Sequence, residues 1–220
     1  MTGPTALLRI AYDDLSALLT SLTDEEGFQP TGCAGWTPVD LGFHLLGDTR
    51  RALVALATPA AAPTDTDAVG YWTAWRPPAP GDDEELWSTR IAASTQGGMA
   101  ALAHRYAETA AAVRVAAGRV GGTERVRTQG RVLTVDDLLS TLVVEAAVHH
   151  LDLVAHLDRP GPADEPLVEV RRVLEGLAGG PLPDRWDDAT AARRGTGREP
   201  LTEPDRAALG DAADRLPLFG

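Results

Sequence analysis

A glutamate and a histidine stand four residues apart in the apolar segment TLVVEAAVHHLDLVAHL (141–157), at Glu145 and His149. Four residues are about one turn of an α-helix, so the two side chains leave the same face. Burying an unpaired carboxylate on such a face is unfavourable. Because imidazole nitrogen and carboxylate oxygen are common zinc ligands, we predict a metal site at this turn.

A third ligand has to come from another part of the chain, and His44 in the apolar segment GWTPVDLGFHLLG is the best candidate. Two histidines and one glutamate form a catalytic zinc set that leaves one coordination position open. With a single cysteine in the sequence, a structural zinc–thiolate site is excluded. The alternative is a site without metal, in which Glu145 and His149 form a hydrogen-bonded pair and His44 is a satisfied core histidine.

Two aspartates are spaced to orient the candidate imidazoles. Asp152 follows His149 by three residues, and Asp40 precedes His44 by four. Carboxylates commonly accept a hydrogen bond from the second ring nitrogen of a ligand histidine. Helix capping is the competing explanation for Asp40.

The other histidines and the cysteine are weaker candidates. His150 points about 100° away from His149 on a helix and is expected to pack or to face solvent. His156 shares the face of His149 but lies two turns along, too far to be favoured as a fourth ligand. His104 is expected on a solvated helix face, and Cys33 as a small buried residue rather than a nucleophile.

The elements that carry these residues are predicted to be helices. Apolar residues recur at spacings of three and four over 5–22, which predicts an amphipathic helix. A second helix begins with Thr37 as N-cap, Pro38 in the first turn and Asp40 completing a capping-box pattern, and it runs to about Ala57.

The middle of the chain predicts a long helix over 84–118, broken at Gly97 and Gly98. Between this helix and the next, Val126 and Leu133 belong to two short strands or to an extended crossover. The aromatic segment 71–87, at the start of the predicted 84–118 helix, is expected to be irregular and partly buried. It is interpreted as a lid packed on the helices, with pocket lining as the alternative.

The last third of the chain begins with another capping pattern, Thr134 followed by Asp137, which opens the helix of Glu145. A shorter helix is predicted over about 165–178. The remaining segment 179–220 is richer in Gly, Pro and charge, and its apolar end RLPLFG is expected to dock on the body of the protein.

Four long helices with a long crossover between the third and fourth predict a mainly α fold, a four-helix bundle with a small C-terminal extension. We assign 1–160 to the bundle and 161–220 to an extension packed on it. Bundles build metal sites from inward-facing residues on facing helices, which is how His44 would reach Glu145.

Composition narrows the class of protein. The chain has 220 residues, of which 44% are apolar and 24% charged, and its formal net charge is -12. Such a surface repels phosphate backbones, so no nucleic-acid partner is expected. No apolar run reaches the length of a membrane span, so we expect no membrane partner. The single cysteine also fits the cytoplasmic location that we expect. As to oligomeric state, we expect a monomer or a homodimer.

Two segments together resemble a known family. PTGCAGWTPVDLGFHLLG (30–47) and EAAVHHLDL (145–153) are similar to the mycothiol-dependent maleylpyruvate isomerases, which belong to the DinB/YfiT-like superfamily of metal-binding four-helix bundles. The resemblance covers roughly residues 5 to 158, and the segment from Trp186 to the end resembles the tail of actinobacterial members. The family's well-known isomerase carries a sterol-carrier-like second domain, whereas 161–220 is shorter and different.

The resemblance implies a DinB-like fold with His44, Glu145 and His149 as ligands of Zn²⁺ or another divalent metal. It also implies mycothiol, or a similar low-molecular-weight thiol, as co-substrate, with its sulfur in the open coordination position. The activity would then be that of an isomerase or an S-transferase acting on a small electrophile. A non-catalytic, metal-stabilised bundle that binds or senses is the alternative.

Two arginines near the end of the chain complete the candidate residues. Arg194 and Arg198 stand out as a basic cluster in an acidic chain, and we predict that they hold an anionic substrate or a carboxylate of the thiol. A solvated basic turn is the alternative.

Overall fold

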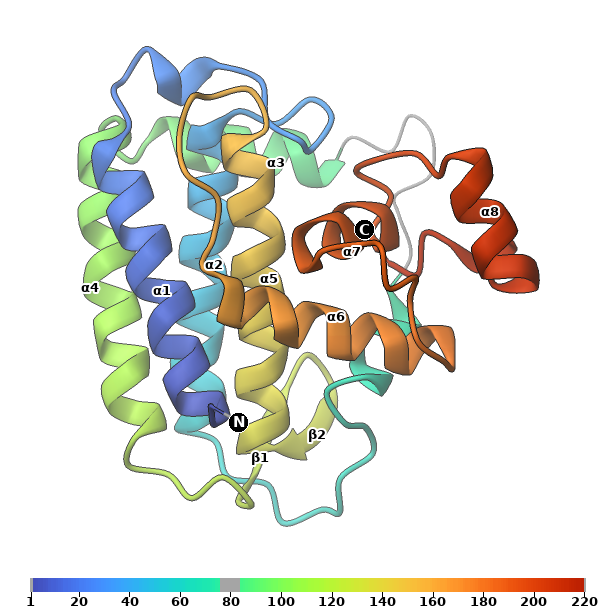
Figure 1. Ribbon diagram of the computed structural model, residues 1–220. Helices are drawn as coiled ribbons and strands as arrows, with labels where there is room; N and C mark the ends of the chain where they lie inside the picture. Colours follow the sequence, from blue (N-terminus) through green and yellow to red (C-terminus); the bar gives the residue numbers. More distant parts are fainter. Residues whose placement is uncertain (1, 76–83, 220) are drawn as a thin grey trace.

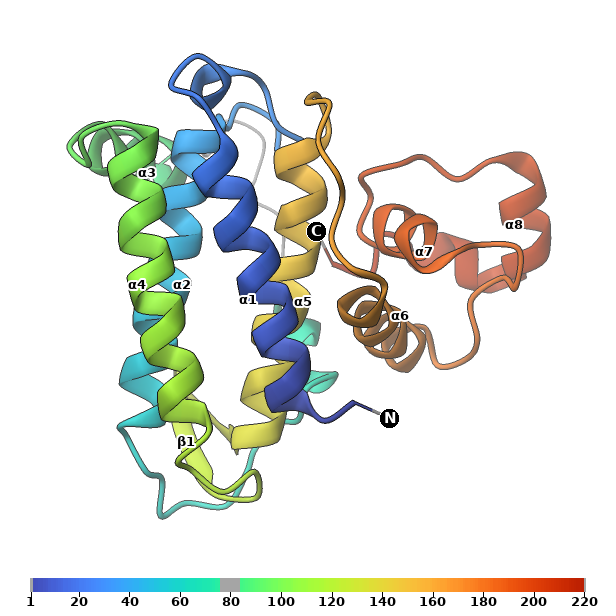
Figure 2. The same cartoon turned by 60° about the vertical axis from the view of Figure 1, so that its left-hand side comes forward.

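A computed structural model describes residues 2–75 and 84–219 and shows a mainly α protein built around a four-helix bundle (Figures 1 and 2). The bundle prediction is therefore confirmed. Its helices are α1 (Pro4–Ser21), α2 (Pro38–Leu56), α4 (Met99–Ala117) and α5 (Val135–Val154).

The bundle helices begin and bury their faces where the local sequence predicts. Thr37 and Asp40 form a reciprocal capping box at the start of α2, and Thr134 caps α5 by accepting a hydrogen bond from the backbone N–H of Asp137 at 3.1 Å. On α1 the apolar residues at spacings of three and four face inward, and Leu15 is fully buried. Local capping and periodicity are sufficient to place these helices.

The long crossover lies elsewhere than predicted. In Figure 1, α2 and α4 run in the same direction, so the chain must return the length of the bundle between them. This connection holds the short 3-10 helix η2 (Gly70–Ala74) and α3 (Glu84–Ser94). By contrast, α4 ends and α5 begins at the same end of the bundle, where an antiparallel hairpin of β1 (Arg125–Thr128) and β2 (Arg131–Thr134) is enough to join them.

Glycines mark the sharp changes of direction. The expected break in the 84–118 helix occurs at Gly97 and Gly98, whose φ angles are 86° and 90°. The hairpin turns at Gln129 and Gly130, with φ angles of 45° and 76°. Backbone with positive φ is readily accessible only to glycine and a few polar residues, which is why these positions interrupt the elements.

The aromatic segment 71–87 is only partly as predicted. Trp72 lies in η2 and is 5% exposed, in keeping with a segment packed on the body. The segment is not irregular throughout, because α3 begins at Glu84, and Trp87 on this helix is 55% exposed. Residues 76–83 lie outside the described part of the chain.

The C-terminal extension consists of α6 (Asp164–Ala178), α7 (Asp188–Gly195), α8 (Glu203–Leu209) and the 3-10 helix η3 (Gly210–Arg215). Its apolar side chains form a second buried cluster with the outer face of α5. The expected docking of the final segment is confirmed, because Phe219 is 5% exposed and stacks on Trp72 with ring centroids 4.4 Å apart. The helices α7 and α8 were not predicted, and the boundary at 160/161 stays a prediction.

No helix in the described ranges is both long enough and apolar enough to cross a membrane.

Candidate metal centre

The three predicted ligands converge from two helices. Nε2 of His44 on α2 lies 3.1 Å from Oε1 of Glu145 on α5. Nε2 of His149, one turn along α5, lies 3.5 Å from the same oxygen. The two imidazole rings meet edge to face, with centroids 5.1 Å apart. All three ligand atoms lie within 4.8 Å of one another.

The spacing of these atoms fits a divalent cation. With metal–ligand bonds of about 2.0–2.1 Å, neighbouring ligands of a tetrahedral zinc site are roughly 3.3 Å apart. The two measured separations, 3.1 and 3.5 Å, bracket this value. The side chains of His44, Glu145 and His149 are 20%, 23% and 15% exposed, so the group is mostly buried yet still reached from a cavity. The chain's own donor set therefore suits zinc.

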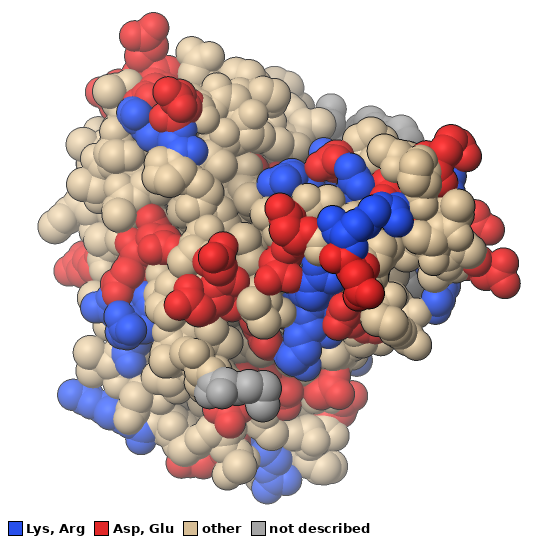
Figure 3. All heavy atoms as spheres, in the orientation of Figure 1, with Lys and Arg blue, Asp and Glu red and all other residues tan. Residues whose placement is uncertain are grey.

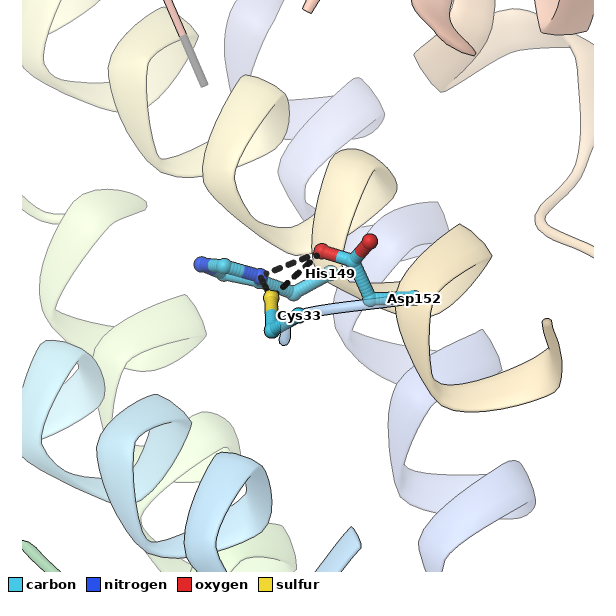
Figure 4. Close-up of side chains that lie close together, drawn as sticks. All are labelled: Cys33, His149 and Asp152. Atoms are coloured by element: carbon cyan, nitrogen blue, oxygen red, sulfur yellow. Dashed lines mark hydrogen bonds and ion pairs between the residues drawn. The ribbon is translucent and has the colours of Figure 1, made fainter. Parts of the chain in front are cut away.

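The second nitrogen of His149 is held by a carboxylate (Figure 4). Its Nδ1 lies 2.9 Å from Oδ2 of Asp152, which is only 1% exposed. Arg198, from the C-terminal extension, donates to both oxygens of Asp152 at 2.7 and 2.8 Å. This arrangement presents Nε2 to the other two ligands, as carboxylate–histidine–metal triads do.

Cys33 joins this group on the side away from Glu145. Its Sγ lies 3.1 Å from Oδ2 of Asp152 and 3.9 Å from Nδ1 of His149, so these three residues form a second cluster with ligand types suited to a metal (Figure 4). The guanidinium of Arg198 already neutralises Asp152 there. A further cation at this place would be repelled, so the set with His44 and Glu145 is the better candidate.

The carboxylate that reaches His44 is not the predicted one. Asp40 is used by the helix cap with Thr37, the competing explanation weighed for it. Asp48, one turn after His44, places Oδ2 at 3.5 Å from Nε2 and is 5% exposed. Its other oxygen pairs with Arg51. The four-residue spacing that singled out Glu145 and His149 also links His44 to Asp48, and this signal was missed.

The remaining histidines lie apart from the centre. His150 is 3% exposed and its ring is bonded to the carbonyl oxygen of Pro160 at 3.1 Å, so it is a packing residue. His104 is exposed on α4, as predicted. His156 is also exposed, but it does not share the helix face of His149 as predicted, because α5 ends at Val154.

Hydrogen bonds have a larger effect than burial on the pKa values of Glu145 and His149. Burial raises the pKa of the Glu145 carboxyl, but hydrogen bonds from His149 and His44 outweigh it and hold this pKa well below its usual range. Burial lowers the pKa of His149, whereas its hydrogen bonds to Asp152, Cys33 and Glu145 raise it well above the usual value. Without a metal, the ring thus keeps a proton between two carboxylates, and a cation at Nε2 would take that proton's place.

Two cavities meet at the centre. The larger, about 890 Å³, is lined by all three candidate ligands and by residues of the extension. The smaller, about 380 Å³, is lined by His44 and Glu145 but extends toward the hairpin. Arg198 lines the larger cavity. Arg194 lines neither cavity, because it pairs with Asp205 at 2.7 Å within the extension.

The sequence over residues 8–154 matches the family model described as "Mycothiol maleylpyruvate isomerase N-terminal domain", a span that includes all three candidate ligands. The chain belongs to this family. No curated protein sequence matches it.

The fold of this mycothiol maleylpyruvate isomerase-family chain is also seen in a solved structure. The crystal structure of the mycothiol-dependent maleylpyruvate isomerase superposes with a TM-score of 0.53 at 16% sequence identity, over 81% of this chain and 71% of that one. At this identity the match shows a shared fold. It does not by itself transfer a reaction, so the activity has to be argued from the site.

Proposed function

We propose that this protein is a metal-dependent enzyme that uses mycothiol, or a similar low-molecular-weight thiol, as nucleophile toward a small electrophilic substrate. The observation that carries the proposal is the convergence of His44, Glu145 and His149 at the meeting point of two cavities. Membership of the mycothiol maleylpyruvate isomerase family supports the choice of thiol.

The chain's own residues have distinct roles in this proposal. His44, Glu145 and His149 would hold the metal, for which zinc is the first candidate. Such an ion lowers the pKa of a bound thiol and so supplies a thiolate near neutral pH. Asp152 fixes the tautomer of His149, and Arg198 holds Asp152. The mainly apolar walls of the larger cavity lower the local dielectric constant, which strengthens electrostatic interactions at the centre.

Three protein ligands leave a position at which the thiol sulfur can bind. The thiolate would add to an electrophilic carbon of the substrate. If the adduct rotates about the former double bond and expels the thiol, the protein is an isomerase. If the conjugate leaves intact, the protein is an S-transferase. We propose small molecules as its partners in either case.

The test is elemental analysis of the untagged protein together with a thiol-dependent activity screen. We expect about one equivalent of a divalent metal and mycothiol-dependent turnover. His149→Ala should lose both, whereas His104→Ala, which changes an exposed histidine of α4, should lose neither. Full metal occupancy in His149→Ala would refute the ligand assignment.

The same samples separate the enzyme from its rival, a bundle that uses metal only as a structural staple. In the rival case, removing the metal should unfold the protein, because structural metal binding is folding free energy. In the enzyme case the apo protein should stay folded but inactive, since its apolar core is extensive. Melting curves recorded with and without chelator distinguish the two.

A further inference from the structure

The two cavities at the candidate metal centre differ in their walls. The larger lies between the segment before α2, the face of α5 and the C-terminal segment. The smaller lies between α2, α5, η2 and the β-hairpin. Both are lined by His44, Glu145, Trp72, Trp75 and Glu85, so these residues form the boundary that the two cavities share at the candidate ligands.

The smaller cavity presents hydrogen-bonding side chains. The residues that line it and not the larger cavity include two cations, Arg51, which pairs with Asp48, and Arg131, together with the hairpin pair Thr128 and Gln129. Tyr71, which also lines this cavity, donates a hydrogen bond to Gln129. Arg131 makes no ion pair with any residue in 2–75 or 84–219. These groups offer donors and acceptors in several directions, as a polyhydroxylated ligand requires.

The larger cavity is walled mainly by apolar side chains. Val144 and Val148 of α5 face Leu218 and Phe219 of the C-terminal segment. The segment is fixed in place, because the backbone N–H of Leu218 donates to the carbonyl oxygen of Gly195 at 2.9 Å. Two arginines also line it: Arg198 is paired with Asp152 and so adds little net charge, and Arg215 donates to the carbonyl oxygen of Ala178 at 2.7 Å. Such a wall favours an apolar, ring-shaped ligand.

We propose that the two cavities divide the two substrates, an inference that rests on the proposed function. The smaller cavity binds the polyhydroxylated, sugar-like part of the thiol, and the larger cavity binds an apolar, ring-bearing electrophile. The thiol sulfur then lies at the junction, beside His44 and Glu145, where both cavities reach it.

The reason for the division is the cost of burying unpaired polar groups. A hydroxyl that enters an apolar cavity without a hydrogen-bond partner loses the hydrogen bonds that it made to water. A polyhydroxylated thiol is therefore disfavoured in the larger cavity and can be satisfied in the smaller one. An apolar ring prefers the larger cavity, because burying its apolar surface is favourable and the ring has no polar group that needs a hydrogen-bond partner.

Two exposed alanines allow a matched test. Ala34 lines only the larger cavity and Ala74 only the smaller. Ala34→Phe and Ala74→Phe add the same ring to one cavity each, at positions outside the buried core. Both variants are prepared as full-length, cobalt-loaded protein, and their melting temperatures are compared with that of the unmutated chain to confirm folding.

Each substrate is then followed by binding rather than by turnover. Mycothiol is titrated through the thiolate-to-cobalt absorption band. The unreactive ring 1,3-dinitrobenzene is titrated through quenching of tryptophan fluorescence, since Trp36, Trp72 and Trp75 line the larger cavity. We expect Ala74→Phe to weaken mycothiol about tenfold and leave the aromatic probe within twofold, and Ala34→Phe to do the reverse.

The outcomes separate the inference from the proposed function. If the unmutated cobalt protein shows no thiolate band with mycothiol, the proposed use of mycothiol fails and the division of the cavities fails with it. If the band appears but Ala34→Phe weakens mycothiol more than Ala74→Phe does, only the division is overturned. Equal effects of both variants on both ligands also overturn the division, because they would mean one undivided cavity.

Discussion

The bundle and the C-terminal extension are held together by different forces. The bundle core is made of apolar side chains such as Leu8, Leu139 and Leu153, all fully buried. In the extension, Asp205 is fully buried and accepts from Trp186 Nε1 and from Arg194, both at 2.7 Å. Figure 3 shows acidic and basic side chains crowded together over the extension.

This difference predicts how each region responds to change. Apolar packing is non-directional and insensitive to pH, whereas a buried charge network depends on each partner being present and ionised. The two regions meet at Arg198 and Asp152, next to the candidate metal centre. The extension is therefore the more easily loosened part, and it contacts Asp152 beside the candidate metal centre.

The largest effect is expected in the bundle core. Leu139→Ala removes a fully buried side chain and should lower the free energy of unfolding by about 2–5 kcal/mol, because the cavity left behind adds to the lost burial. Urea unfolding monitored by circular dichroism measures this. Val115→Ala, at a residue that is 53% exposed on α4, is the control and should change stability by less than about 0.5 kcal/mol.

A smaller and more local effect is expected in the extension. Asp205→Ala removes the acceptor of Trp186 Nε1 and of Arg194 Nη1, together with the N3 side chain of the α8 capping box, which should destabilise the extension by about 2 kcal/mol. Hydrogen exchange should accelerate at amides of α7 and α8 but not of α1 or α4. Asp214→Ala, at an exposed aspartate, is the control. Equal acceleration in α1 and α4 would mean that the two regions unfold as one unit.

Lowering the pH should destabilise the extension as Asp205→Ala does, but to a smaller extent. Burial raises the pKa of Asp205, yet hydrogen bonds from Thr202, Trp186 and Arg185 outweigh it, and the folded pKa lies below the unfolded value. Its stabilisation is thus complete above the unfolded pKa of about 3.9 and is lost as pH falls through the folded pKa.

Hydrogen exchange measured at a series of decreasing pH values tests this order of opening. We expect α7 and α8 to lose protection before α1 and α4 do. A bundle that opens at the same pH as the extension would contradict the proposed difference between the regions.

The smallest effect is expected where the regions meet. Arg198→Gln removes the cation that holds Asp152 and should weaken metal binding about tenfold while leaving the unfolding of the bundle unchanged. Chelator competition measures the affinity. Arg198→Lys should restore part of it, and Arg206→Gln, at an exposed arginine, should have no effect. Unchanged affinity in Arg198→Gln would show that the extension does not act on the centre.

The sequence was sufficient for features that depend on neighbouring residues. The capping residues Thr37 and Thr134 mark the starts of α2 and α5, and Gly97 marks a break, because caps and positive φ are local properties. Asp152 was found by its spacing from His149, which a helix converts into proximity. Asp48 could have been found in the same way from His44.

The features that were missed depend on how elements dock. The position of the crossover follows from the parallel directions of α2 and α4, which no local pattern encodes. Arg198 was noticed only for its charge, and its partner Asp152 could not be named. The helices α7 and α8 are short and lie in a segment rich in Gly, Pro and charge, where periodicity is weak.

By itself, the sequence determined that Glu145 and His149 share one face of a helix, because helical geometry turns a spacing of four residues into contact. The sequence identified His44 as a candidate ligand but could not show that it lies close to Glu145. Only the tertiary structure joined His44 to Glu145 across 101 residues, and Arg198 to Asp152 across 46. Such contacts depend on the packing of the whole chain, and so do the two cavities that meet at the centre.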